Sequence, residues 1–90
     1  MDIAEIVEKM IGLSDGNVED INHFMKVWAY ARTIGKKEWV EMQSQYILEA
    51  AAVIHDIACP LCREKYGNAD GKHQEAESEP LVRAFFAGTD

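Results

Sequence analysis

The ten residues LEAAAVIHDI, at positions 48–57, carry most of the information in this 90-residue chain. Ala50, Ala51 and Ala52 favour a helix and are small enough to let a second helix approach closely. The run ends in His55 and Asp56, two adjacent side chains that can each bind a metal ion. Because a buried aspartate is rare unless it is paired or metal-bound, the pair indicates a functional site on this helix.

Around this segment, apolar residues recur at spacings of three and four, which predicts amphipathic helices. The predicted helices cover about residues 3–11, 17–34, 38–58 and 72–87. Asp2 is a candidate cap for the first, Gly35 a stop for the second and Pro60 a stop for the third. Residues 60–72 are rich in turn formers and predict a loop, and Pro80 either kinks or restarts the last helix.

No strand pattern accompanies these helices, so we expect an all-α bundle of about four helices forming one domain over residues 1–90. A hydrophobic fraction of 48% is ordinary for a folded chain of this size. Aromatic side chains are expected to supply much of the core. The expected core aromatics are Phe24, Trp28, Tyr46, Phe85 and Phe86.

The chain is acidic, with 16 Asp and Glu against 9 Lys and Arg and a net charge of −7. Both ends are acidic and the middle is close to neutral, because residues 21–63 hold four acids and five bases. This distribution argues against nucleic acid polymers as partners. It remains compatible with a small phosphorylated substrate, since a bound metal can outweigh the net charge.

No apolar run approaches the roughly 20 residues that span a bilayer, and the first residues lack the features of a secretion signal. We therefore expect a cytoplasmic protein with no membrane partner, in which Cys59 and Cys62 are reduced thiols. The Cys59-Pro60-Leu61-Cys62 segment also raises a redox or zinc interpretation. A redox motif of this kind usually lies between a strand and a helix, and this chain has no strand pattern. A structural zinc site usually has four ligands, and this pair supplies two. Two ordinary thiols are therefore the preferred interpretation.

His23, on the predicted second helix, completes a set of three candidate ligands with His55 and Asp56. Two imidazoles and one carboxylate suit borderline divalent ions such as zinc, manganese, iron or nickel. Two neighbouring helices can hold three ligands on one side of an ion and leave the other side for water and substrate. Taken alone, a helical histidine such as His23 is more often a packed or surface residue than a ligand.

The segments NHFMKVWAYA, at residues 22–31, and LEAAAVIHDI together resemble the HD-domain metal-dependent phosphohydrolase superfamily. The later segments YG, at residues 66–67, and GKHQEAESEPLVR, at residues 71–83, are similar to the loop and following helix of small bacterial HD proteins. The resemblance covers about residues 17–87 and implies an HD-like helical bundle. It also implies that His23, His55 and Asp56 bind a divalent ion, for which Mn, Fe, Ni, Co, Zn and Mg are the candidates.

The resemblance also makes His73 a candidate for holding a second metal ion, as later histidines do in two-metal HD proteins. Further candidates for binding the substrate or orienting a ligand are Lys26, Lys72, Glu75 and Arg83. For His73, Lys72, Glu75 and Arg83, a solvated surface position is the preferred interpretation. HD sites usually also contain a late aspartate on a further helix, and the family core has more helices than these 90 residues provide. Asp90 lacks a helical context, so we do not assign it that role.

Two functions follow as expectations. The first is a metal-dependent HD-type phosphohydrolase acting on a nucleotide or another small phosphate ester. The second is a non-catalytic HD-like module that binds metal or forms a homo-oligomer and lacks the last ligand. Whether the chain is an enzyme depends on whether its metal site is completed.

Overall fold

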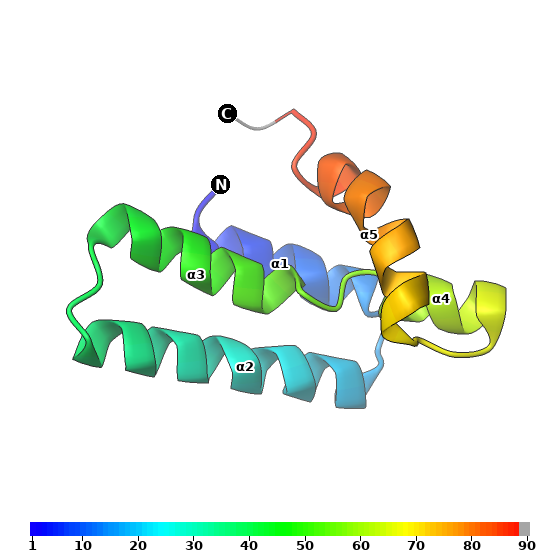
Figure 1. Cartoon of the computed structure of the whole chain (residues 1–90), viewed down its shortest axis with the longest axis horizontal. Helices are drawn as coiled ribbons and strands as arrows, with labels where there is room; N and C mark the ends of the chain where they lie inside the picture. The colour runs from blue at the N-terminus through cyan, green and yellow to red at the C-terminus, as the bar shows by residue number, and fades with distance from the viewer. Residues whose placement is uncertain (89–90) are drawn as a thin grey trace. The chain divides into compact units, whose positions relative to one another are not determined.

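The computed structural model describes residues 1–88 and contains five helices (Figure 1). They are α1 (Ile3–Leu13), α2 (Val18–Lys37), α3 (Met42–Ile54), α4 (Cys59–Tyr66) and α5 (Gly71–Phe85). No strand occurs among the described residues, which confirms the all-α class. Asp90, which received no site role, lies outside the described residues. None of the helices within residues 1–88 is long and apolar enough to cross a membrane.

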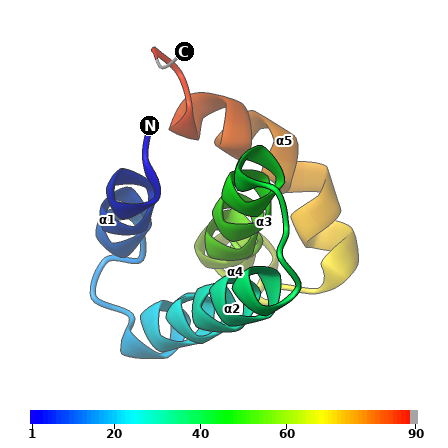
Figure 2. The same ribbon diagram turned by 90° about the vertical axis from the view of Figure 1, so that its left-hand side faces the viewer.

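The chain divides into two compact units, Met1–His55 and the segment that starts at Asp56. In the first unit, α2 and α3 run antiparallel and side by side, and α1 packs against α3 (Figure 2). Asp2 caps α1 as expected, because its side chain accepts the Glu5 N–H at 2.8 Å in a capping box. The buried apolar side chains of this unit are Ile6, Met10, Phe24, Ala50, Ala52 and Val53.

Gly35 lies inside α2, so the expectation that this glycine ends the helix is wrong. The residue is buried, and a Cβ placed on it would lie 1.8 Å from Oε1 of Gln45 on α3. A side chain at position 35 would therefore force the Gln45 amide to move from its place between the two helices. Gly35 is explained by close helix packing, and α2 continues to Lys37.

The third helix is shorter than expected, because α3 ends at Ile54 and a turn follows before α4 begins at Cys59. Pro60 gives the physical reason. It has no N–H to donate to the Asp56 carbonyl, and its ring clashes with a carbonyl four residues earlier in a continuous helix. The Cys59 N–H donates to the Asp56 carbonyl instead, at 3.0 Å, which closes a turn. His55 and Asp56 therefore lie just beyond the helix and not within it.

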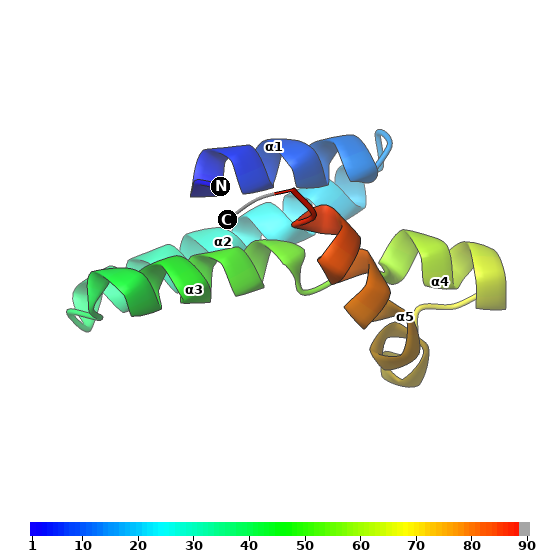
Figure 3. The ribbon, with the colours of Figure 1, turned by 90° about the horizontal axis from the view of Figure 1, so that it is seen from above.

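The second unit contains a helix that the sequence interpretation had assigned to a loop. Pro60 lies in the first turn of α4, where its missing N–H costs no hydrogen bond, and Gly67 ends α4 with a left-handed φ of 81°. A loop joins α4 to α5 (Figure 3). Because α5 continues through Pro80, the second of the two alternatives for this residue, a restart of the helix, is wrong.

Glu77 on α5 links the two helices of this unit. Its carboxylate accepts hydrogen bonds from Lys65 Nζ and Tyr66 Oη of α4, each at 2.7 Å. The hydrogen bond from Lys65, with a smaller contribution from that of Tyr66, holds the pKa of Glu77 below its usual value. The same contact raises the pKa of Lys65, as expected for an ion pair.

The expected aromatic core is confirmed in part. Phe24 and Phe85 are buried, and Trp28 and Phe86 are half-buried. Tyr46 is exposed, so its assignment to the core is wrong. Its hydroxyl donates to the Met1 carbonyl, a contact that keeps the polar end of the ring at the surface.

Replacing Gly35 by Ala should destabilise the protein by about 1–3 kcal/mol, because the new methyl group overlaps the Gln45 side chain in a packed interface. Urea unfolding followed by circular dichroism measures this change. Gly12→Ala is the matched control, since Gly12 lies in α1 with nothing within 4 Å of an added Cβ. That change should be neutral or stabilising by up to about 1 kcal/mol. Equal effects at the two glycines would contradict the packing explanation.

Candidate metal centre

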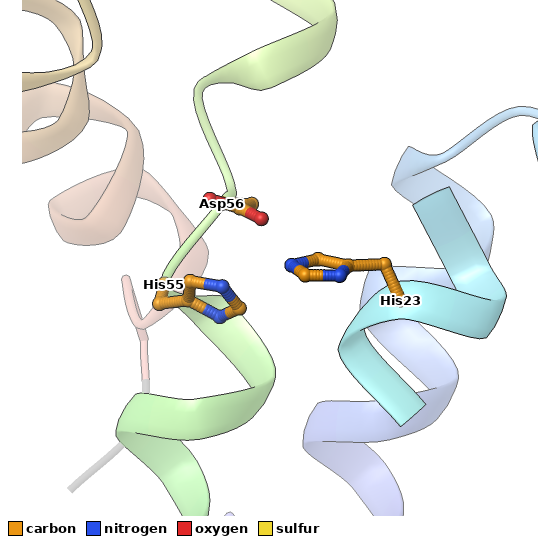
Figure 4. A group of neighbouring side chains, drawn as sticks. All are labelled: His23, His55 and Asp56. Carbon is orange, nitrogen blue, oxygen red and sulfur yellow. The ribbon is translucent and has the colours of Figure 1, made fainter. Parts of the chain in front are cut away.

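The three predicted ligands come from two chain segments that the α2–α3 pair brings together. His23 lies on α2, near its N-terminal end, and His55 directly follows the C-terminal end of α3. Because α2 and α3 are antiparallel, these ends are neighbours, and the His23 and His55 ring centroids lie 5.3 Å apart. Asp56 is joined to His55 by one peptide bond, which keeps its carboxylate beside the pair (Figure 4).

Donor atoms from His23, His55 and Asp56 all lie within 4.8 Å of one another. A divalent ion held at bonds of about 2.0–2.2 Å needs donors roughly 3–4 Å apart. The group therefore has to contract slightly to bind an ion. Both histidines are exposed and Asp56 is half-buried, so small side-chain rotations can achieve this contraction.

The His55 ring makes a hydrogen bond that is typical of metal ligands. Its Nδ1 lies 2.7 Å from the Ala52 carbonyl oxygen. Because a carbonyl oxygen only accepts, Nδ1 must carry the proton, which leaves the lone pair on Nε2. Metal-binding histidines usually donate their second N–H to a carbonyl or carboxylate in this way. The turn after α3 thus presents His55 in a form that can bind an ion.

Two of the other residues with expected site roles, Lys26 and His73, lie on different helices. Lys26 is exposed on α2, three residues after His23, and therefore lies on the same side of the helix. His73 on α5 stacks on Tyr66 with ring centroids 4.0 Å apart, and its Nδ1 lies 2.9 Å from Asn68 Oδ1.

Three further candidates lie on α5, within the second unit. Lys72 and Glu75 are exposed, and Arg83 pairs with Glu79 at 2.8 Å. The ligand group found among residues 1–88 contains neither His73 nor Glu75. The roles of Lys26, Lys72, His73, Glu75 and Arg83 stay predictions.

Cys59 and Cys62 are buried free thiols in the first turn of α4. As expected, the two cysteines come after a helix, which is α3, and they also begin the next helix, α4. Neither belongs to the ligand group among the described residues. The interpretation of the pair as two ordinary thiols stays a prediction.

The sequence interpretation missed Glu49, an acidic residue in the same apolar run as His55 and Asp56. Glu49 is 3% exposed and accepts hydrogen bonds from Trp28 and Gln45. The signal was present, because a charged residue in an alanine-rich helix needs a partner. The reasoning applied to His55 and Asp56 applies equally to Glu49.

No protein family matches this chain, and comparisons with curated proteins and with solved structures give no match. Inference about function therefore depends on the donor chemistry and positions of the three ligands. Two imidazoles and a carboxylate form a mixed nitrogen and oxygen set, which suits borderline divalent ions. The residues present fit such an ion.

The hydrogen bond to Ala52 predicts that neutral His55 carries its proton on Nδ1. Long-range ¹H–¹⁵N correlation spectra, recorded above the pH at which the histidines titrate, distinguish the two tautomers. We expect His55 to give the pattern of protonated Nδ1 and unprotonated Nε2. A His55 ring protonated on Nε2 would contradict the geometry and leave the Ala52 carbonyl without this donor.

Proposed function

We propose that His23, His55 and Asp56 bind a divalent metal ion and that the chain is an HD-type phosphohydrolase. The observation that carries this proposal is the His55 ring, whose Nδ1–H is engaged by the Ala52 carbonyl beside a second imidazole and a carboxylate. In the neutral ring with the proton on Nδ1, Nε2 is the atom of His55 that would bind the ion. Manganese, iron, nickel, cobalt, zinc and magnesium are the candidate ions.

The exposure of the ligand group favours a catalytic over a structural metal. Structural zinc sites are closed by four protein ligands, whereas catalytic sites keep an open position. Here three protein ligands come together among the described residues, and both histidines are exposed. A substrate can therefore approach the open side of the group.

The proposed substrate is a nucleotide or another small phosphate ester. A divalent ion at this site would polarise a phosphoryl oxygen and activate water for attack at phosphorus. Lys26 lies on the same side of α2 as His23, where its ammonium group can attract the phosphate. Lys72 and Arg83 are the further basic candidates for this role.

The alternative is a non-catalytic HD-like module that binds metal or forms a homo-oligomer. One observation favours it, since the ligand group among residues 1–88 has three members and includes no second carboxylate. A three-ligand site can bind an ion without supporting turnover. Metal binding and hydrolysis are therefore tested separately.

Metal binding should depend on each of the three ligands. We expect Co²⁺ or Zn²⁺ titrated calorimetrically into the metal-free protein to bind with 1:1 stoichiometry. His23→Ala, His55→Ala and Asp56→Ala should each weaken binding by at least about 100-fold, more than the loss of an outer-shell partner does. Glu64→Ala is the control, since Glu64 is exposed on α4 and has no proposed site role, and it should retain the wild-type affinity. Equal losses in Glu64→Ala and His55→Ala would place the ion elsewhere.

Hydrolysis is tested by phosphate release from a panel of nucleotides and small phosphate esters with added Mn²⁺, Ni²⁺ or Co²⁺. We expect activity that requires metal and is lost in His55→Ala, while Lys26→Ala should mainly raise KM. Unchanged activity in a His55→Ala protein that no longer binds metal would reject the phosphohydrolase proposal. Bound metal with no hydrolysis across the panel would favour the non-catalytic module, and sedimentation would then measure its oligomeric state.

A further inference from the structure

Glu49 is a carboxylate buried at the contact between α2 and α3. Its side chain is 5% exposed and accepts Trp28 Nε1–H from α2 at 2.9 Å. It also accepts Gln45 Nε2–H from the preceding turn of its own helix at 2.7 Å. Arg32, one turn after Trp28 on α2, places Nη1 3.6 Å from the carboxylate. Donors from both helices therefore meet at one acceptor.

Glu49 is held in its ionised form by these neighbours. Burial alone raises the pKa of this carboxyl group. The hydrogen bonds from Gln45 and Trp28 and the charges of Arg32 and Lys36 together outweigh burial, so the pKa lies below its usual value. At neutral pH the contact is therefore a buried anion with directional hydrogen bonds.

Besides the close approach of Gly35 to Gln45, the buried residues next to Glu49 offer few directional contacts. The α3 residues buried beside Glu49 include Ala50, Ala52 and Val53, which are small and apolar. Such surfaces let one helix slide or rotate against another at small cost, whereas a buried polar contact can specify register. The hydrogen bond between Trp28 and Glu49 holds one residue of α2 opposite one residue of α3.

This contact lies close to the candidate metal centre. Trp28 follows His23 by five residues and Glu49 precedes His55 by six, so each separation is roughly 7–9 Å along a helix axis. A slip of one residue moves a helix by about 1.5 Å and turns its side chains by about 100°. Such a slip would separate the His23 and His55 rings, whose centroids lie 5.3 Å apart.

We propose that Glu49 is a positioning residue, whose hydrogen bonds with Trp28 and Gln45 fix the register of α2 and α3 and so bring His23 and His55 together. Its effect on metal affinity rests on the proposed metal-binding function. Its effect on the two imidazoles does not, because both rings can be observed in the metal-free protein.

The first experiment measures that effect directly on the full chain without metal. We expect a nuclear Overhauser effect between the His23 and His55 ring protons in the wild-type protein, and its loss or marked weakening in Glu49→Gln and in Trp28→Phe. Glu49→Gln replaces one accepting carboxylate oxygen with an amide nitrogen that cannot accept, and it removes the negative charge opposite Arg32. Trp28→Phe removes one donor while keeping an aromatic ring. Trp39→Phe is the matched control, because Trp39 is 91% exposed, and it should keep the effect.

The second experiment separates positioning from general stabilisation. Gln45→Met/Glu49→Met replaces both polar side chains with flexible apolar ones of similar length, a kind of change that often preserves or raises stability. We expect thermal unfolding to stay cooperative with Tm at or above the wild-type value, while the ring contact is lost and Co²⁺ affinity falls about 10- to 100-fold. If Glu49 only stabilised the fold, a variant with unchanged Tm would keep the wild-type affinity for Co²⁺.

A rescue variant addresses Glu49→Gln directly. Gln45→Glu/Glu49→Gln exchanges the two groups, so that the amide now at position 49 can accept from Trp28 and donate to the new carboxylate one turn away. We expect this exchange to restore the ring contact that Glu49→Gln loses. Restoration supports a role in hydrogen bonding, and failure to restore the contact in a folded protein argues against it.

The outcomes separate this inference from the metal proposal. A wild-type protein that shows the ring contact but binds no metal would reject the metal site and leave the positioning role to be judged on the ring contact alone. A wild-type ring contact that persists in folded Trp28→Phe and Gln45→Met/Glu49→Met proteins would overturn the positioning role, whatever the metal result. If Glu49→Gln fails to fold, these two variants decide the question.

Discussion

The close approach of α2 and α3 is the constraint on which the first unit depends. Gly35 leaves room for the Gln45 amide of the facing helix, which any side chain at position 35 would displace. The Gln45 amide in turn donates to Glu49, which also accepts the Trp28 indole N–H across the interface. Packing and hydrogen bonding therefore act on the same helix pair. His23 and His55 meet because they belong to neighbouring ends of this antiparallel pair.

Pro60 supplies a second constraint, which acts on the backbone that carries the ligands. It prevents α3 from continuing through Asp56, and the chain turns before α4 begins. His55 caps α3 with helical backbone angles, φ −58° and ψ −29°. The His55 ring bonds the Ala52 carbonyl, and the Asp56 carboxylate lies beside both histidines. The candidate ligands therefore lie where α3 ends and the turn before α4 begins.

The sequence predicted those features that depend on local periodicity. It identified α1 with its Asp2 cap, and it selected the three residues whose donor atoms come together. It misjudged Gly35 and Pro60, since each has two physical explanations that a single sequence does not separate. A glycine can end a helix or admit a neighbour, and a proline can end one helix or begin another. Glu49 was missed because its partners, Trp28 and Arg32, are distant in sequence and adjacent only in the folded pair.

The position of the carboxylates bears on the chemistry of the candidate centre. Although the net charge is −7, the central segment that carries the ligands is nearly neutral. Glu49 lies in this segment, but its charge is opposed by Arg32 and by two hydrogen bonds inside the interface. Asp56 thus supplies the carboxylate of the candidate ligand group. Lys26 and Asp20, three residues after and before His23, add one positive and one negative charge on that side of α2. A divalent ion would exceed the single negative charge of its ligands and leave the centre net positive, which is the polarity that binding a phosphate ester requires. On the proposed function, the bound ion would thus let an acidic chain attract an anionic substrate.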